Sequence, residues 1–335
     1  MKKFNYIGSF ILLIVVSLLC ISMGSVNIPL ETTLTSLYNL ITNVGATGSE
    51  QQIIMAIRIP RVLSAGLVGM ALALSGATMQ GLLKNPLADG STLGVSAGGS
   101  LGAVIAIITG FSLPFLPFTG VMLSAIFFAF LSMLFILWAT YRIDRTLSSS
   151  TLILMGIVFS MFVNSVISLL LVFYDDKIEQ IIFWTMGSLS GTTYQDVLML
   201  FTIFVVFGGI ILVHAEEVNA FSLGEEQARN LGVDVQKVRM LLLISVAALI
   251  GTAVAIAGTI GFVGLVVPHI SRMLVGPNHK RLYPMAIMFG AIFLMLTDLI
   301  ARTIAAPLEL PIGIITSFIG AIVFIFIFKN QKRGS

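Results

Sequence analysis

Long apolar runs, bounded by charged residues or by proline and glycine, follow one another along almost the whole chain. A helix that crosses a membrane needs about 20 apolar residues. Charged residues make up only 10% of the 335 residues, whereas a soluble domain carries about 25%. The sequence therefore predicts an all-α polytopic membrane protein, with residues 1–335 forming a single transmembrane domain. Ten transmembrane helices are expected, at 7–27, 62–83, 93–113, 117–140, 151–173, 197–214, 240–260, 262–275, 284–303 and 311–328.

The distribution of lysine and arginine predicts the orientation of these helices, because cytoplasmic loops carry an excess of both. With the N-terminus in the cytoplasm, fourteen of the 18 bases fall inside and only Arg58, Arg61, Lys177 and Arg302 fall outside. Removing one span would reverse every later loop and abolish this bias. We therefore expect both termini to be cytoplasmic. The first apolar segment is expected to be an uncleaved helix, since no small-x-small cleavage site follows it.

The motifs of ATP hydrolysis and metal chemistry are absent from the sequence. It contains neither G-x-x-x-x-G-K-[ST] nor H-E-x-x-H, and its lone cysteine, Cys20, excludes intramolecular disulfides and cysteine-based metal clusters. No acidic residue falls in the middle of a predicted span, although ion-coupled carriers usually keep ionisable groups there. We therefore expect neither an enzyme nor a secondary carrier, no cofactor in this chain, and an energy source on another chain.

One cytoplasmic connection, residues 216–239, is longer and more charged than the others. Ser222 and Glu225 have the spacing of a capping box, Gly232 can end a helix in a left-handed conformation, and Asp234 can start the next helix. A helix of about nine residues is marginal by itself in water. We expect this one to pack on the protein body or on a partner; the alternative is a charged loop that only fixes the topology.

The external arginines Arg58, Arg61 and Arg302 allow two interpretations. Exposed guanidiniums can pair with carboxylates of a docked protein, where bidentate geometry fixes the register. Alternatively, they contact lipid phosphates, and Arg302 forms an i,i+4 pair with Asp298.

Polar and small residues inside the spans also allow two interpretations each. Asn164, Ser165 and Ser168 of the fifth span either hydrogen-bond a neighbouring helix or line a hydrated path. The row of Gly94, Gly98 and Gly102 lets helix backbones approach closely, either within the chain, which is favoured, or between two chains.

Several blocks, in order from about residue 50 to the end, resemble the permease subunits of ABC importers for iron-siderophores, haem and vitamin B12. They are RIPR at 58–61, ALALSGA at 71–77, NPLAD at 85–89, LGVSAG at 93–98, FWTMGS at 183–188, SLGEEQARNLGV at 222–233, GFVGLVVPH at 261–269 and ELPIG at 309–313. The resemblance implies a type II ABC importer permease fold with ten helices in the bacterial cell membrane.

The resemblance also implies partners. Two permease chains would pack together, as a homodimer or a heterodimer, with two ATPase subunits inside that bind ATP and Mg, and with an extracytoplasmic substrate-binding protein outside. Leu223–Leu231 would form the coupling helix seated on the ATPase. The expected coupling residues are Ser222, Leu223, Gly224, Glu225, Glu226, Ala228, Arg229, Leu231 and Gly232.

Three further roles follow from the resemblance. Arg58, Arg61 and Arg302 would receive glutamates of the binding protein. Leu87, Ser149 and Ser150 would match the cytoplasmic gate, and the fifth and tenth spans would flank the central path.

The resemblance does not decide between several substrates, and two other classes of protein stay open as alternatives. A ferric siderophore is the expected substrate because it is the commonest assignment in the family, with haem or cobalamin as alternatives. The rivals from other classes are an ion-coupled carrier and a scaffold that anchors partners.

Overall fold

A computed structural model describes residues 6–24, 26, 28–42, 45, 48–90, 92–112 and 120–333, with the side chains of 327–333 excepted. These ranges contain helices and connecting turns and no strand. Each predicted span coincides with a helical segment. They are α1 (Tyr6–Ser22), α4 (Ile59–Leu82), α5 (Val95–Thr109), α6 (Gly120–Ile143), α7 (Ser149–Phe173), α9 (Tyr194–Ile203) with η3 (Phe204–Gly208) and α10 (Gly209–Val213), α13 (Val235–Ala257), α14 (Val263–Val275), α15 (His279–Thr303) and α16 (Ile312–Arg333).

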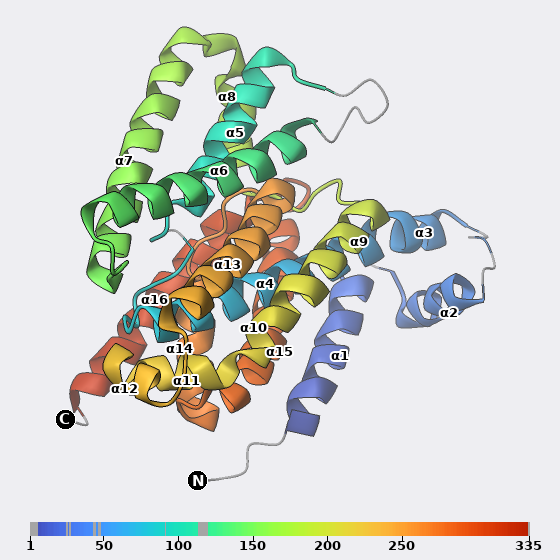
Figure 1. The fold of residues 1–335 in the computed structure, drawn as a ribbon. Helices are drawn as coiled ribbons and strands as arrows, with labels where there is room; N and C mark the ends of the chain where they lie inside the picture. The colour runs from blue at the N-terminus through green and yellow to red at the C-terminus, as the bar shows by residue number, and fades with distance from the viewer. Residues whose placement is uncertain are drawn as a thin grey trace.

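Six of these segments are long and apolar enough to cross a membrane, whereas α1, α5, α14 and the described part of α16 are shorter apolar helices. The count of ten crossings therefore stays a prediction. The described start of α1 and the end of α16 lie at the same end of the molecule as α11 (Ala215–Leu223) and α12 (Glu225–Asn230) (Figure 1). The cytoplasmic side of both termini stays a prediction as well. Residues 117–119 of the fourth predicted span, and Lys2 and Lys3, lie outside the described residues.

Several short elements were not predicted as separate helices. They are α2 (Leu30–Ile41), α3 (Ser49–Gln52), η1 (Ile53–Arg58), η2 (Asp175–Lys177) and α8 (Ile178–Thr185). The segment η1 is a π-helical turn, in which the Ile59 amide donates to the Ile54 carbonyl. Pro60 follows directly and has no N–H to donate, so the regular α-helical pattern is interrupted where α4 begins.

Helix α4 forms the centre of the bundle, and nearly every one of its residues is buried. Helices α13, α14 and α15 pack around it (Figure 1). Glycines allow two of these crossings. A Cβ atom on Gly69 would lie 2.1 Å from the Gly290 oxygen of α15, and one on Gly76 would lie 2.0 Å from the Gly264 oxygen of α14. Backbones in direct contact gain the van der Waals packing that holds membrane helices together.

The row of Gly94, Gly98 and Gly102 packs against other helices of the same chain, which is the interpretation favoured from the sequence. A Cβ atom on Gly98 would lie 2.3 Å from Ser132 Oγ of α6, and one on Gly102 would lie 2.4 Å from the Ser124 oxygen. Helix α7 packs mainly on α5 and α6 at the edge of the molecule, and few of its side chains are buried (Figure 1).

The contact between Gly69 and Gly290 predicts a strong effect of one added methyl group. Gly69→Ala should lower the free energy of unfolding by at least about 1–3 kcal/mol, because backbone atoms cannot give way to the new Cβ as a flexible side chain would. Thermal unfolding in detergent measures this. Gly209→Ala is the matched control, since a Cβ atom there meets nothing within 4 Å. Equal melting temperatures for the two variants would contradict the prediction.

Candidate functional site

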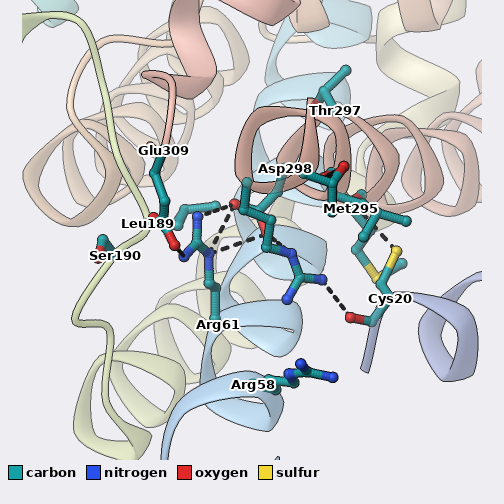
Figure 2. Close-up of polar contacts among 12 residues, drawn as sticks. Cys20, Arg58, Arg61, Leu189, Ser190, Met295, Thr297, Asp298 and Glu309 are labelled. Atoms are coloured by element: carbon teal, nitrogen blue, oxygen red, sulfur yellow. Dashed lines mark hydrogen bonds and ion pairs between the residues drawn. The ribbon is translucent and has the colours of Figure 1, made fainter. Parts of the chain in front are cut away.

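Charged residues from distant parts of the chain meet in one cluster (Figure 2). Arg61, in the first turn of α4, donates from Nε to Asp298 Oδ1 of α15 at 3.0 Å and from Nη1 to Glu309 Oε2 at 2.9 Å. Arg302 Nε lies 3.5 Å from Asp298 Oδ2, so the predicted i,i+4 pair is confirmed. Asp298 is 1% exposed. One buried carboxylate is thus shared by two arginines, and Glu309 adds a second negative charge beside Arg61.

Two of the arginines also hold the end of α1. Arg58 donates to the backbone carbonyls of Ile21, Ser22 and Val26, and Arg302 donates to that of Cys20. The last carbonyls of a helix have no partner within the helix and carry the negative end of its dipole. A guanidinium with five donors therefore fixes this end both by hydrogen bonds and by charge.

The expectation that Arg58, Arg61 and Arg302 are exposed is wrong in this structure, because their side chains are almost completely buried. The reason is that Asp298, Glu309 and the end of α1 supply their partners, which offsets the cost of removing the charges from water. Their role in docking stays a prediction. Glu309 is the more exposed of the two carboxylates that pair with Arg61, since its side chain is 38% exposed and that of Asp298 only 1%.

The coupling segment predicted from the sequence consists of two short helices. Helix α11 ends at Leu223, Gly224 follows with φ of +126°, and α12 spans Glu225–Asn230. Gly232 has φ of +87°, and Asp234 caps α13 by accepting a hydrogen bond from the Lys237 amide at 3.2 Å, so both predicted ends are confirmed. Helix α11 lies against the end of α4, since a Cβ atom on Gly81 would meet Val218 at 2.5 Å.

The predicted capping box of Ser222 and Glu225 is wrong. Ser222 still belongs to the last turn of α11, where its hydroxyl donates to the Val218 carbonyl at 3.3 Å. The residue before α12 is Gly224, which has no side chain to cap with. Glu225 instead forms an ion pair with Arg239. The spacing of Ser222 and Glu225 does not show to which helix Ser222 belongs. Because the chain turns at Gly224, Ser222 ends α11 and Glu225 begins α12.

The predicted coupling residues divide into two faces. Ala228 is fully buried against the protein body, and Gly224 and Glu225 are half-buried. The outward face carries Ser222, Leu223, Glu226, Arg229, Leu231 and Gly232. Leu223 and Leu231 are each 65% exposed, so they flank α12 with two large apolar side chains in an otherwise polar segment.

Arg239, which was predicted only as one of the bases that set the topology, links three parts of this region. It lies in the second turn of α13 and is 1% exposed. Its Nη1 donates to the carbonyls of Thr146 and Leu147 at 3.0 and 2.8 Å, and its Nη2 pairs with Glu225 of α12. One buried guanidinium therefore joins α12, α13 and the turn that precedes α7.

That turn is ordered by Asp144, which accepts hydrogen bonds from the Thr146 amide at 2.8 Å and the Ser148 amide at 3.1 Å. Hydrogen bonds from Ser148 and Thr146 hold the pKa of Asp144 well below its usual range, so the carboxylate stays charged at neutral pH. Leu147 has φ of +54°, in the left-handed region.

The predicted gate residues lie on two separate turns. Ser149 and Ser150 begin α7, and the Ser150 hydroxyl lies 3.4 Å from that of Ser148. Leu87 is exposed on a turn in which its amide donates to Asn85 Oδ1 at 2.9 Å. The gate assignment stays a prediction.

The polar residues of the fifth predicted span, Asn164, Ser165 and Ser168, are exposed on α7. The two serine hydroxyls donate to carbonyls of their own helix, Met161 at 3.0 Å and Asn164 at 2.9 Å. Within the described chain these two hydroxyls therefore bond their own helix. The two interpretations, a hydrogen bond to a neighbouring helix and a hydrated path, stay predictions for Asn164, Ser165 and Ser168.

A cavity of about 740 Å³ lies between α4, α13, α14 and α16. Its lining includes the polar residues Thr185, Thr259, Ser317 and Asp89 and apolar residues such as Phe262 and Phe318. The connection between α13 and α14 is unwound here, with φ of +68° at both Gly258 and Phe262. Among the described residues, no three His, Cys, Asp or Glu side chains form a metal site. The sequence analysis missed this cavity, although the closely spaced Gly258 and Gly261 signal a break.

A bundle of apolar helices, a partly open pocket among them and a pair of short helices at one end are typical of a membrane transport permease. Comparison with known proteins identifies it further: the model of the FecCD transport family matches residues 12–330, and the chain belongs to this family. It is an integral membrane permease subunit of the ABC transporter class.

Relatives match over nearly their whole length. The chain is 42% identical to the uncharacterized ABC transporter permease protein YvrB of Bacillus subtilis, covering 98% of this chain and 94% of the relative. It is 34% identical to the molybdate import system permease protein MolB of Haemophilus influenzae, covering 98% and 96%. Other relatives are named as permeases for hemin, cobalamin and Fe(3+)-citrate.

A solved structure supports the same fold. An ABC transporter described as of the metal-chelate type, in an inward-facing conformation, aligns with a TM-score of 0.85 and 32% identity. The alignment covers 97% of this chain and 98% of that one.

The charge cluster predicts that Asp298 is essential for stability. Asp298→Asn should lower the free energy of unfolding by about 3–5 kcal/mol, because it leaves Arg61 and Arg302 buried without their shared counter-charge. Glu309→Gln is the control; its partly exposed pair with Arg61 should contribute under about 1 kcal/mol. Thermal unfolding of both variants in the same detergent measures the difference, and an unchanged melting temperature for Asp298→Asn would contradict it.

Proposed function

We propose that this chain forms, together with a second permease chain, the path of an ATP-driven importer for a bulky metal chelate, with a ferric siderophore as the first candidate. The observation that supports this most directly is the cavity of about 740 Å³ at the break between α13 and α14. Unwound backbone inside a membrane protein is tolerated where it lines a cavity, and such breaks mark substrate paths.

The lining of the cavity suits a large ligand whose metal is already coordinated. Hydroxyls and aromatic rings can contact the outer surface of a chelate, and a few polar groups in an apolar pocket are enough to orient it. Haem and cobalamin are alternatives of the same kind, and relatives named for hemin and cobalamin permeases support them. The relative named for molybdate import adds a small oxyanion to the substrates that a test must include.

The partner that hydrolyses ATP is proposed to dock on α12. Its outward face offers Leu223 and Leu231 as apolar anchors, with Glu226 and Arg229 between them. Buried apolar anchors surrounded by charged residues are typical of protein interfaces. The segment stands on the same end of the molecule as the described chain ends, which is therefore proposed to face the cytoplasm (Figure 1).

The substrate-binding protein is proposed to dock at the opposite end, near the arginine cluster. In the conformation described here the guanidiniums are engaged within the chain. Docking at Arg61 would therefore proceed by exchange, with a carboxylate of the partner replacing the partly exposed Glu309.

Arg239 is proposed to carry movement of α12 to the gate. It contacts Glu225 on the side of the ATPase and the carbonyls of Thr146 and Leu147, directly before Ser149 and Ser150. A displacement of α12 would thus pull on the turn that starts α7.

Reconstitution tests the function. Vesicles that contain this chain, a partner ATPase and a substrate-binding protein should accumulate radiolabelled ferric siderophore only when ATP and the binding protein are both present. Haem, cobalamin and molybdate are assayed in parallel to identify the substrate. Uptake by the chain alone, driven by an ion gradient, would instead establish a secondary carrier.

Arg239→Met tests the transmission of movement. We expect uptake to fall about tenfold or more, because a hydrogen bond to a charged group contributes about 1.5–3 kcal/mol and Arg239 makes several. ATP turnover by the assembled complex should persist, so that hydrolysis and uptake become uncoupled.

Lys237→Met is the matched control for this variant. Lys237 carries the same charge two residues earlier and is exposed. In the part of the chain that the structure describes, its ammonium group pairs with Asp234 at 2.8 Å. Equal ratios of uptake to hydrolysis in the two variants would refute a special role for Arg239, as would failure of Arg239→Met to assemble with the ATPase.

A further inference from the structure

Helix α2, which the sequence analysis did not predict, has three distinct faces. It spans Leu30–Ile41 and lies at the periphery of the molecule, beside the end of α1 (Figure 1). A helix at the surface of a soluble protein has two faces, one apolar toward the core and one polar toward water. The third face of α2 therefore needs an explanation.

The first face packs on the protein and is partly polar. Thr33 and Ser36 are fully buried, and their hydroxyls donate to the carbonyls of Pro29 and Thr32. Asn39 is buried as well, and its Nδ2 donates to Gln51 Oε1 at 3.4 Å. Leu37 and Leu40 pack on the core beside them.

The second face is apolar and uncovered. Leu30, Leu34, Tyr38 and Ile41 are between 51% and 82% exposed, and their spacing of four, four and three residues places them in one row along the helix. The third face adjoins this row and carries the exposed Glu31 and Thr35. One side of the uncovered surface is thus apolar, and the other is polar.

We propose that α2 lies in the membrane–water interface, with the row Leu30, Leu34, Tyr38 and Ile41 inserted among lipid acyl chains. In this position the first face contacts the protein, the apolar row contacts lipid, and the third face, with Glu31 and Thr35, contacts water. Exposed apolar side chains also precede α2 in the chain, at Val15 and Leu19 of α1 and at Met23 and Val26 after it, as expected where a lipid-facing helix leads into an interfacial one.

The composition of α2 fits lipid as the occupant of this face. The helix contains no lysine or arginine and only one acidic residue, so attraction to a charged partner cannot hold it. Apolar burial is then the force that positions it, and tyrosine is a residue that favours the interface.

The position of α2 also bears on the charge cluster. Helix α2 packs on η1, the π-helical turn that ends at Arg58. Anchoring α2 in the interface therefore fixes the depth of this turn, and with it the depth of Arg58, relative to the bilayer.

Spin-label accessibility tests the proposal directly. In a Cys20→Ser background, nitroxides are attached at Leu34→Cys, at Ile41→Cys and at the adjacent control Thr35→Cys, and the protein is placed in phosphatidylcholine nanodiscs. Relaxation by oxygen, which concentrates in lipid, is compared with relaxation by a water-soluble nickel chelate. We expect the ratio of oxygen to nickel accessibility to be several-fold higher at 34 and at 41 than at 35.

Two results would overturn the proposal. Equal ratios at positions 34 and 35 would place the row in water. Protection of positions 34 and 41 from both reagents would mean that protein covers the row; because these nanodiscs contain this chain alone, that protein would be a second copy of the chain. Wild-type-like melting of the Cys20→Ser parent ensures that the labels report on the folded chain.

Discussion

A guanidinium buried in a membrane protein needs a carboxylate or backbone carbonyls as partners, and Asp298 of α15 provides the carboxylate for both Arg61 of α4 and Arg302 of its own helix. The carboxylate sets how far α15 can slide along α4, because a shift by one turn would leave a buried charge without its partner. Glu309 ties the entrance of α16 to the same point, and Arg58 and Arg302 bring in the end of α1. Four helices are thus registered by one cluster.

The glycine crossings extend this register along the bundle. Gly69 meets Gly290, and Gly76 meets Gly264, with backbones in contact. Helices packed this closely have little freedom to shift. In contrast, α7 contacts few neighbours, and α12 is short and largely exposed. A conformational change that preserves the centre of the bundle therefore has to use these outer elements, and Arg239 lies where they meet.

The spans could be predicted from the sequence because apolar length is a local property, and each predicted segment coincides with a helical one. Helix α2 could not, since twelve residues with a mixed surface carry no length signal. The pairing of Asp298 with Arg302 follows from helical spacing, whereas Glu309 reaches Arg61 only through the tertiary fold, so the burial of the arginines was missed. The capping box failed for a related reason: Ser222 and Glu225 have the right spacing, but Gly224 turns the chain between them.

The backbone of Leu147 has a consequence for how the start of α7 can behave. A residue with a side chain pays a conformational penalty of order 1–3 kcal/mol in a sparsely populated region such as this one. The carbonyl of Leu147 is held by Arg239 and its side chain is buried, so the surroundings sustain the unfavourable geometry. Arg239 therefore helps to hold Leu147 in this conformation. If the guanidinium withdrew, Leu147 could return to a more favourable backbone conformation, and this change at one residue would alter the direction of α7.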